Sequence, residues 1–307
     1  MTNLSPENYG LNPYHADFIK KIAPLVKGKT VLEIGGSTFP RKWLFDILGV
    51  KKWVCVDYCE FYDNLFLNAW IEESKVKPTD FLFSPLSETK YVFNKHDYVK
   101  LDGDATKIPC DLYDQFDVVV SLCAFEHISK LNEVVEKIYL CLKKGGMLYA
   151  YFGPIWSCSI GHHYGDFREN AYSFNTVARD GVLPFIHLLY DENTIRDLYT
   201  KKPLPFGQSQ LDKLCKSCFH SNSTNRLFYE DYEKIMQRSS FERHKVFSHN
   251  YNLLATIRHF RKLHRMYPGY MRFDAYMGVI IAKKSGEAGT HDPCPSFEAC
   301  KNFWAGR

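Results

Sequence analysis

A glycine-rich turn follows the first apolar run of the chain, in residues 30–49, TVLEIGGSTFPRKWLFDILG. Such a turn between a strand and a helix is the usual binding site of a nucleotide. Gly35, Gly36 and Ser37 do not give the three glycines of the dinucleotide pattern G-x-G-x-x-G. The carboxylate of Glu33, just before them, would repel a pyrophosphate. The turn therefore predicts a ligand other than a dinucleotide.

Two further carboxylates follow the next apolar runs. Asp57 lies 22 residues after Gly35, where a carboxylate can accept from both hydroxyls of an adenosine ribose. Asp104 lies in LDGDATKIPC, after the next run, and can accept from an adenine amino group. Acidic residues often end strands, so each position alone is weak evidence. Together they indicate an adenosine site.

Three histidines are candidates for proton transfer. His162 and His163 are adjacent in a glycine-flanked loop, and His187 follows Pro184 in an apolar setting. A neutral imidazole can accept a proton near pH 7. Successive side chains of an extended loop alternate faces, so we expect only one of the adjacent pair to reach an acceptor. His187 is the reserve candidate for the general base.

Metal binding is the alternative for these residues. The three histidines and Asp166 lack the close, regular spacing of most metal sites, so we expect none here. Cys215 and Cys218 form a single C-x-x-C without the second pair that a zinc site needs. Glu126 and His127 begin the segment that follows the apolar run of residues 116–121, where we expect helix capping and packing.

Apolar, β-branched runs alternate with segments of helical spacing through the first half of the chain. Runs that are almost entirely apolar suit strands buried on both faces of a parallel sheet. Helical spacing is found in residues 39–49 and 131–146, the second with a C-terminal stop at Lys143–Gly145. The alternation predicts a doubly wound α/β sheet. The expected strands cover residues 30–34, 53–56, 98–101, 116–121 and 147–152.

The second half is less regular. Residues 61–95 are too long for a simple crossover and indicate an insertion, and residues 153–216 show little periodicity. The expected later elements are a helix (229–238), a strand (245–251), a basic helix (253–266) and a last strand, MGVIIAKK. We expect the tail from residue 285 to be poorly ordered.

Bulk composition limits the class of protein. Of 307 residues, 45% are hydrophobic and 24% charged, as in an ordinary globular chain, and a net charge of +4 does not by itself indicate nucleic acid. The ten cysteines lack disulfide-framework spacing, and neither a signal peptide nor an apolar run long enough to span a membrane is found. We therefore expect free thiols and a cytoplasmic protein.

Taken in order, the motifs resemble those of class I S-adenosylmethionine-dependent methyltransferases. They are VLEIGG, VDY, GDATKIP, FDVVVSLCAFEHI and CLKKGGMLY, and the match covers residues 28–152. The resemblance implies a Rossmann-like sheet of seven strands, with the last antiparallel beside the sixth and insertions after strands 2, 5 and 6. It also implies a methyltransferase domain over 1–284 and a tail over 285–307. That domain would comprise a cofactor core (28–152), an acceptor-side insertion (153–227) and a basic helical insertion (252–274).

The resemblance also assigns roles at the cofactor. S-adenosylmethionine has no phosphate that the carboxylate of Glu33 would repel. Its methionine portion carries an ammonium group, which Glu33 can neutralise. The turn Gly35–Gly36–Ser37 would let the backbone approach the methionine portion, with Ser37 where the family usually has glycine. The remaining cofactor assignments are Asp57 at the ribose, Asp104 and Ala105 at the adenine, and Ser121 and Leu122 at the methionine and sulfonium end, with Tyr58 as a further cofactor-binding residue.

The sequence says less about the methyl acceptor than about the cofactor. The GHH and PFIHLLY segments are similar to segments of bacterial methyltransferases associated with surface-glycan clusters. That similarity implies O-methylation of a small molecule or carbohydrate, with a histidine as base and Tyr164 at the substrate. The basic run 258–265, with Arg258 and Arg261, would suit a phosphate-bearing acceptor such as a nucleotide-sugar, or is a solvated helix face.

Two other functions stay open. One is N-methylation of a protein or nucleic acid, and the other is a catalytically silent, cofactor-binding partner subunit. Against nucleic acid, the loop after the fourth strand reads SLCA and lacks the Asn/Asp-Pro-Pro-aromatic motif of base-modifying enzymes. No separate RNA-binding module is recognisable in the sequence.

Overall fold

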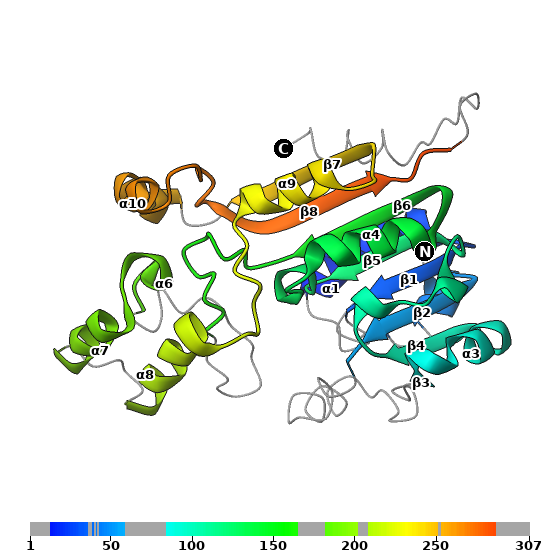
Figure 1. The fold of residues 1–307 in the computed structure, drawn as a ribbon, viewed down its shortest axis with the longest axis horizontal. Coiled ribbons are helices and arrows are strands. Elements are labelled where there is room, and N and C mark those ends of the chain that lie inside the picture. The colour runs from blue at the N-terminus through cyan, green and yellow to red at the C-terminus, as the bar shows by residue number, and fades with distance from the viewer. Residues whose placement is uncertain are drawn as a thin grey trace.

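The computed structural model describes residues 13–35, 39, 41, 43–58, 84–164, 182–201, 208–250 and 253–286. Their strands form one mixed sheet in the order β3-β4-β2-β1-β5-β6-β8-β7 (Figure 1). The strands are β1 (Thr30–Ile34), β2 (Lys52–Asp57), β3 (Ser84–Pro85), β4 (Tyr98–Asp102), β5 (Phe116–Leu122), β6 (Leu142–Phe152), β7 (Arg243–Asn250) and β8 (Ala275–Lys283). The predicted α/β fold is confirmed, and the eighth strand is the two-residue β3 at the edge of the sheet.

The centre of the sheet is parallel and buried. Strand β1 pairs in parallel with β2 on one side and with β5 on the other. All five residues of β1 are buried, as expected for a strand covered on both faces. The chain runs from β1 to β2, β3 and β4 on one side of β1 and then crosses to β5 on the other side. The carboxyl ends of β1 and β5 therefore flank a topological switch point, where ligands of open α/β sheets bind.

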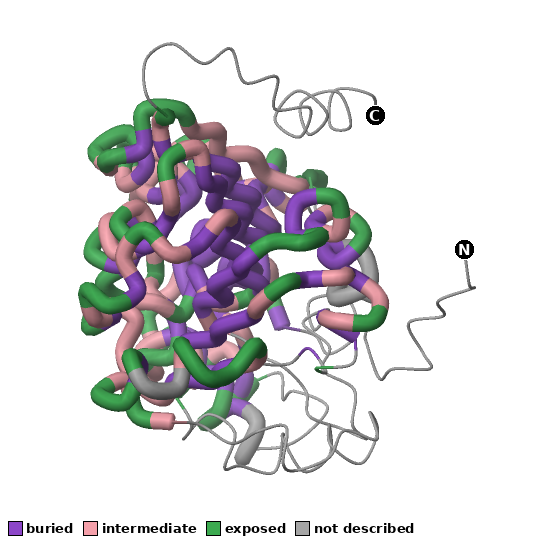
Figure 2. The backbone as a smooth tube through the Cα atoms, turned by 90° about the vertical axis from the view of Figure 1, so that its right-hand side faces the viewer, coloured by how far each residue is buried: buried purple, intermediate pink, exposed green. Residues whose placement is uncertain are grey.

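Helices cover both faces of the sheet (Figure 1). On one face, α1 (Pro13–Val26) and the single turn η2 (Trp43–Ile47) pack against β1, β5 and β6. On the other, α4 (Leu131–Cys141) and α9 (Tyr229–Arg238) enclose the second apolar core. Figure 2 shows this buried interior within a more exposed outer shell. The small elements between β3 and α4 are η5 (Leu86–Glu88), α3 (Thr89–Lys95), η6 (Ala105–Lys107), η7 (Cys110–Leu112) and η8 (Phe125–His127).

The C-terminal strand pair agrees with the sequence-based expectation. Strand β8 inserts between β6 and β7 and runs antiparallel to both. Helix α4, however, ends at Cys141, and β6 starts at the next residue because Leu142 pairs with Phe116 of β5. The expected helix stop at Lys143–Gly145 was therefore wrong, since these residues lie within β6.

The segment after β6 contains more helix than its weak periodicity indicated. Beyond the carboxyl ends of the parallel strands lie α6 (Ile186–Leu189), α7 (Glu192–Lys201), α8 (Gln208–Cys215), η10 (Lys216–His220) and α10 (Leu253–Met266) (Figure 1). Helix α7 buries only Ile195 and Tyr199, four residues apart, so its apolar pattern is too sparse to stand out. Cys215 and Cys218 are buried in the small core that α7 and α8 share.

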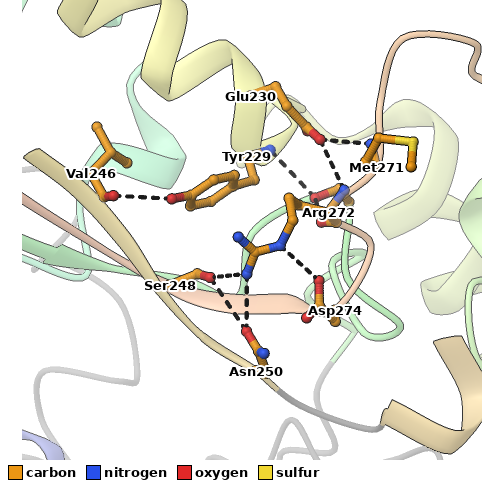
Figure 3. A network of polar contacts seen from close by, with 9 residues as sticks. Tyr229, Glu230, Val246, Ser248, Asn250, Met271, Arg272 and Asp274 are labelled. Atoms are coloured by element: carbon orange, nitrogen blue, oxygen red, sulfur yellow. Dashed lines mark hydrogen bonds and ion pairs between the residues drawn. The ribbon is translucent and has the colours of Figure 1, made fainter. Parts of the chain in front are cut away.

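The segment after α10 is fixed to the sheet by Arg272 (Figure 3). Its guanidinium donates to Asp274 Oδ1 at 3.1 Å and to Ser248 Oγ at 2.6 Å. It also lies 4.9 Å from the ring of Tyr229. The backbone N–H groups of Met271 and Arg272 both donate to Glu230 Oε1. The return from α10 to β8 is therefore held between α9 and β7. Among the described residues, no helix combines the length and apolarity needed to cross a membrane.

Candidate active site

The turn after β1 passes close to the loop after β5. Gly35 has a φ of +67°, in the left-handed region, and its N–H donates to Val56 O at 2.9 Å. A Cβ at this position would lie 2.3 Å from Cβ of Ala124. Glycine is therefore required both by the backbone conformation and by the contact. Gly36 and Ser37 lie outside the described residues.

Glu33 lies beneath this turn and is only 1% exposed. Trp53 Nε1 donates to its Oε2 at 2.9 Å, whereas Oε1 has no hydrogen-bond partner among the described residues. Burial raises the pKa of Glu33 to about 7, against the lowering effect of the Trp53 hydrogen bond. The negative charge of Asp57 raises this pKa further, and the positive charge of Lys100 lowers it. A ligand ammonium group near Oε1 would stabilise the ionised form.

Two other predicted carboxylates lie at the ends of neighbouring strands. Asp57 ends β2, and its Oδ1 accepts from the N–H of Tyr58 at 2.8 Å. Asp104 caps η6, which begins at Ala105, and its Oδ1 accepts from both the N–H and the hydroxyl of Thr106. Burial would raise the pKa of Asp104, but hydrogen bonds from Thr106 and Tyr58 lower it overall. This carboxylate is thus ionised and already partly engaged in capping.

The end of β5 is tied to β1. Ser121 is buried, and its hydroxyl donates to Ile34 O at 2.8 Å. Leu122 is also buried. The Ser121 hydroxyl therefore fixes the switch point, and contacts of Ser121 and Leu122 with a cofactor stay predictions.

These features fit S-adenosylmethionine better than a dinucleotide. One edge of the sheet holds a buried Glu33 oxygen that lacks a described donor, a turn where only glycine fits, and the carboxylates of Asp57 and Asp104. An ammonium group, a ribose and an adenine amino group are donors that such a row of carboxylates can bind.

The adjacent histidines point in different directions, as expected. The ring of His162 lies 5.3 Å from that of His187, and the ring of His163 lies 5.3 Å from that of His127. His162 is buried, and its Nδ1 accepts from the N–H of Tyr164 at 3.0 Å. Because an N–H group can only donate, the neutral ring of His162 carries its proton on Nε2. Tyr164 itself is buried in the core shared with α6, α7 and α8.

His163 and His187 have the opposite pattern. His163 Nδ1 donates to Gly161 O at 2.8 Å, and the lone pair is on Nε2. His187 Nε2 donates to Trp156 O at 2.7 Å, which leaves the lone pair on a buried Nδ1. Burial is the main cause that lowers the pKa of His163 to about 3 and that of His187 to about 4. Burial also lowers the pKa of His162 well below its ordinary value, so all three rings are weaker bases than the sequence analysis assumed.

Glu126 and His127 lie beside His163, whereas the sequence predicted only helix capping and packing for them. Glu126 is buried; its Oε1 accepts from the N–H of Gly153 at 2.8 Å, and its Oε2 has no described partner. Burial raises the pKa of Glu126, although His127 and the Gly153 N–H oppose this. His127 Nε2 lies 3.9 Å from Glu126 Oε1. The available signal was that Glu-His and Gly-His-His follow two strands that are neighbours in the sheet.

The basic helix α10 lies beside α6. Leu263 is buried between them, and the Lys262 ammonium lies 4.5 Å from the ring centre of Tyr190. Arg258 and Arg261 are exposed. Their predicted contact with the acceptor stays a prediction, and Asp166, the fourth residue considered for a metal, lies outside the described residues.

Comparisons with known proteins point to the same class. Residues 74–150 match a family model described as a methyltransferase domain. No curated protein is significantly similar to the chain in sequence.

Solved structures similar to the chain include three methyltransferases, two described as S-adenosylmethionine-dependent and one solved with S-adenosylmethionine bound. A putative methyltransferase from Listeria monocytogenes has 13% identity and a TM-score of 0.45, over 88% of this chain and 97% of that one. One from Mesorhizobium loti has 12% identity and a TM-score of 0.43, over 89% and 98%. Phosphoethanolamine N-methyltransferase 2 of Haemonchus contortus, in complex with S-adenosylmethionine, has 13% identity and a TM-score of 0.41, over 89% and 52%. At these values the similarities carry no detail of the site.

The family match lies within the part of the chain that carries the motifs and the parallel sheet. Over residues 74–150 the chain is therefore similar to methyltransferase domains, and S-adenosylmethionine is the cofactor that this match and the motifs support.

Proposed function

We propose that the protein transfers a methyl group to a hydroxyl oxygen of a small-molecule or carbohydrate acceptor. The observation that carries this proposal is the cluster of Glu126, His127 and His163 at the same sheet edge as Glu33 and Gly35. A hydroxyl has a pKa far above 7, so its proton must leave as the oxygen attacks. This cluster supplies proton-accepting groups where the acceptor must approach the cofactor.

The residues divide the work between binding and proton transfer. S-adenosylmethionine, when bound, supplies a methyl group already activated on a sulfonium. Glu33, Asp57 and Asp104 hold and orient it, which brings the reacting groups together. For the proton, His163 is the histidine we favour, because its Nε2 carries a lone pair near Glu126 and His127. His162 carries its proton on Nε2, and His187 stays the reserve candidate.

A phosphate-bearing acceptor, such as a nucleotide-sugar, is the more specific form of the proposal. Helix α10 presents Arg258 and Arg261 beside the elements that lie beyond the carboxyl ends of the strands. A guanidinium group binds phosphate through paired hydrogen bonds.

The proposed division of the chain is a cofactor core (28–152), an acceptor-side insertion (153–227) and a basic helical insertion (252–274). A cytoplasmic location is supported by cysteines without disulfide spacing.

The test is to incubate the protein with S-adenosylmethionine and a panel of nucleotide-sugars and hydroxylated small molecules. We expect S-adenosylhomocysteine to form and mass spectrometry to place the methyl on oxygen. His163→Gln should lower kcat by about 10²–10⁴-fold with cofactor affinity intact. His220→Gln is the matched control, because His220 is an exposed imidazole paired with Glu192.

Two outcomes would favour the other functions. Methyl groups found on nitrogen, in a peptide or nucleic acid, would replace this proposal with N-methylation. Cofactor binding without turnover on any acceptor class, restored only by a second protein, would indicate a catalytically silent partner subunit.

A further inference from the structure

Glu126, His127 and His163 bring three potential metal ligands to one point. Two of them come from η8, after β5, and His163 comes from the loop after β6. One ligand atom from each residue lies within 4.8 Å of the other two. The chain thus places two imidazole nitrogens and one carboxylate oxygen together from neighbouring strand ends.

Both imidazoles are held in the form that binds metal. His163 Nδ1 donates to Gly161 O at 2.8 Å, and His127 Nδ1 contacts Ser223 O. A carbonyl oxygen only accepts, so each Nδ1 carries the proton and each Nε2 carries the lone pair. Histidines that bind metals usually donate their other ring N–H to a carbonyl or carboxylate in this way, which fixes the ring orientation.

Glu126 supplies the third ligand. One carboxylate oxygen, Oε1, is held by the N–H of Gly153, while the buried Oε2 has no hydrogen-bond partner among the described residues. Oε1 is the oxygen that lies 3.9 Å from His127 Nε2. A buried carboxylate with one oxygen lacking a donor is unfavourable, and a cation bound to the carboxylate would offset that cost.

The loop before α9 fixes the backbone of this ligand pair. Asn225 Nδ2 donates to Phe125 O and Ile128 O on either side of the pair. The Asn225 N–H donates to Glu126 O, and Ser223 of the same loop contacts the ring of His127. The two ligands are thus supported by a second segment of the chain, as metal ligands in proteins commonly are.

We propose that Glu126, His127 and His163 bind a divalent first-row transition metal ion such as Zn²⁺. Two histidines and one carboxylate form the donor set of catalytic zinc sites, which keep a coordination position open. The His127 side chain is 42% exposed, so an ion can reach the cluster from solvent. The inference departs from our sequence-based expectation of no metal, because that expectation did not include Glu126 and His127.

The ion's open position would take the acceptor hydroxyl. A bound cation would lower the pKa of the coordinated hydroxyl, so that its proton would be lost to solvent before the oxygen attacks the methyl group. His163 would then act as a ligand and not as the proton acceptor. This catalytic role rests on the proposed function, whereas the binding of the ion does not.

Metal binding can be measured without turnover. Protein dialysed against a chelator would be titrated with Zn²⁺ by calorimetry and with Co²⁺ by visible absorption. We expect one ion per chain and a Co²⁺ spectrum of nitrogen and oxygen ligands. Loss of an outer-shell partner typically weakens metal binding by 10–100-fold, so His127→Ala, His163→Ala and Glu126→Gln should each weaken it by about 100-fold or more. His220→Ala, outside the cluster, should leave it unchanged.

Several outcomes would overturn the site. Metal binding that survives all three ligand substitutions would refute the site. A thiolate-to-cobalt absorption band that disappears in Cys123→Ser would also refute it, because Cys123 is exposed three residues before Glu126 and would then be the ligand. Unchanged S-adenosylhomocysteine binding and unfolding midpoints would show that the variants are folded. Metal binding with full activity in the chelated protein would confirm the site and refute its role in deprotonation. Activity without any metal binding would refute the site and leave the proposed function standing.

Discussion

Glu33→Gln should change how the stability of the protein depends on pH. The folded protein raises the pKa of Glu33 from 4.5 to about 7, mainly through burial. Ionisation is therefore easier in the unfolded chain, so the stability that neutral Glu33 contributes is complete below pH 4.5, falls as the pH rises from 4.5 and is fully lost above 7. This pKa difference corresponds to a loss of about 3 kcal/mol. Glutamine keeps an oxygen that can accept from Trp53 Nε1 but cannot ionise.

The assay is urea unfolding of both proteins at several pH values from 5 to 8. Other titrating groups are common to the two proteins, so the difference in free energy of unfolding isolates residue 33. We expect similar stabilities at pH 5 and a variant that gains on the wild type by up to about 3 kcal/mol at pH 8. S-adenosylhomocysteine should shrink this difference, because its ammonium group would stabilise the charged carboxylate. A difference that stays constant from pH 5 to 8 would refute our account of Glu33 as a buried acid that titrates near neutrality.

Three further predictions concern the cofactor and the acceptor. Asp57→Ala should weaken binding of S-adenosylhomocysteine by about 1.5–3 kcal/mol in calorimetry, the range for charge-assisted hydrogen bonds, and tight NAD binding instead would contradict the assigned cofactor. Gly35→Ala should lower the thermal midpoint and cofactor affinity, because its Cβ would meet Ala124 at a φ of +67°; wild-type values for both would show that the turn adapts. Replacing Arg258 and Arg261 with alanine should raise the acceptor KM and leave cofactor affinity unchanged. An unaltered KM would indicate that the basic face of α10 is only solvated and does not bind the acceptor.

The sheet was largely predictable because its strands are buried on both faces. Residues 30–34 were predicted with the bounds of β1, and the other four predicted strands of the first half lie within β2, β4, β5 and β6. Helices α9 and α10 were predicted with their observed bounds. Helices α7 and α8 were missed, because their small core combines few apolar residues from each helix. A long apolar run can be recognised in the sequence itself. A few apolar residues per helix cannot, because they form a core only when the two helices pack together.

The sequence by itself determined the class of the protein. The order of its motifs predicted the parallel sheet and the cofactor, because turn glycines and strand-end carboxylates act through local geometry and fixed spacing. It also offered three histidines as candidates for proton transfer, His162 or His163 first and His187 in reserve. Only the tertiary structure distinguished them, because the carbonyl and N–H groups around each ring decide which nitrogen carries the proton. Tertiary structure also joined Glu126 and His127 to His163, since the ends of β5 and β6 are neighbours in the sheet but lie far apart in the chain.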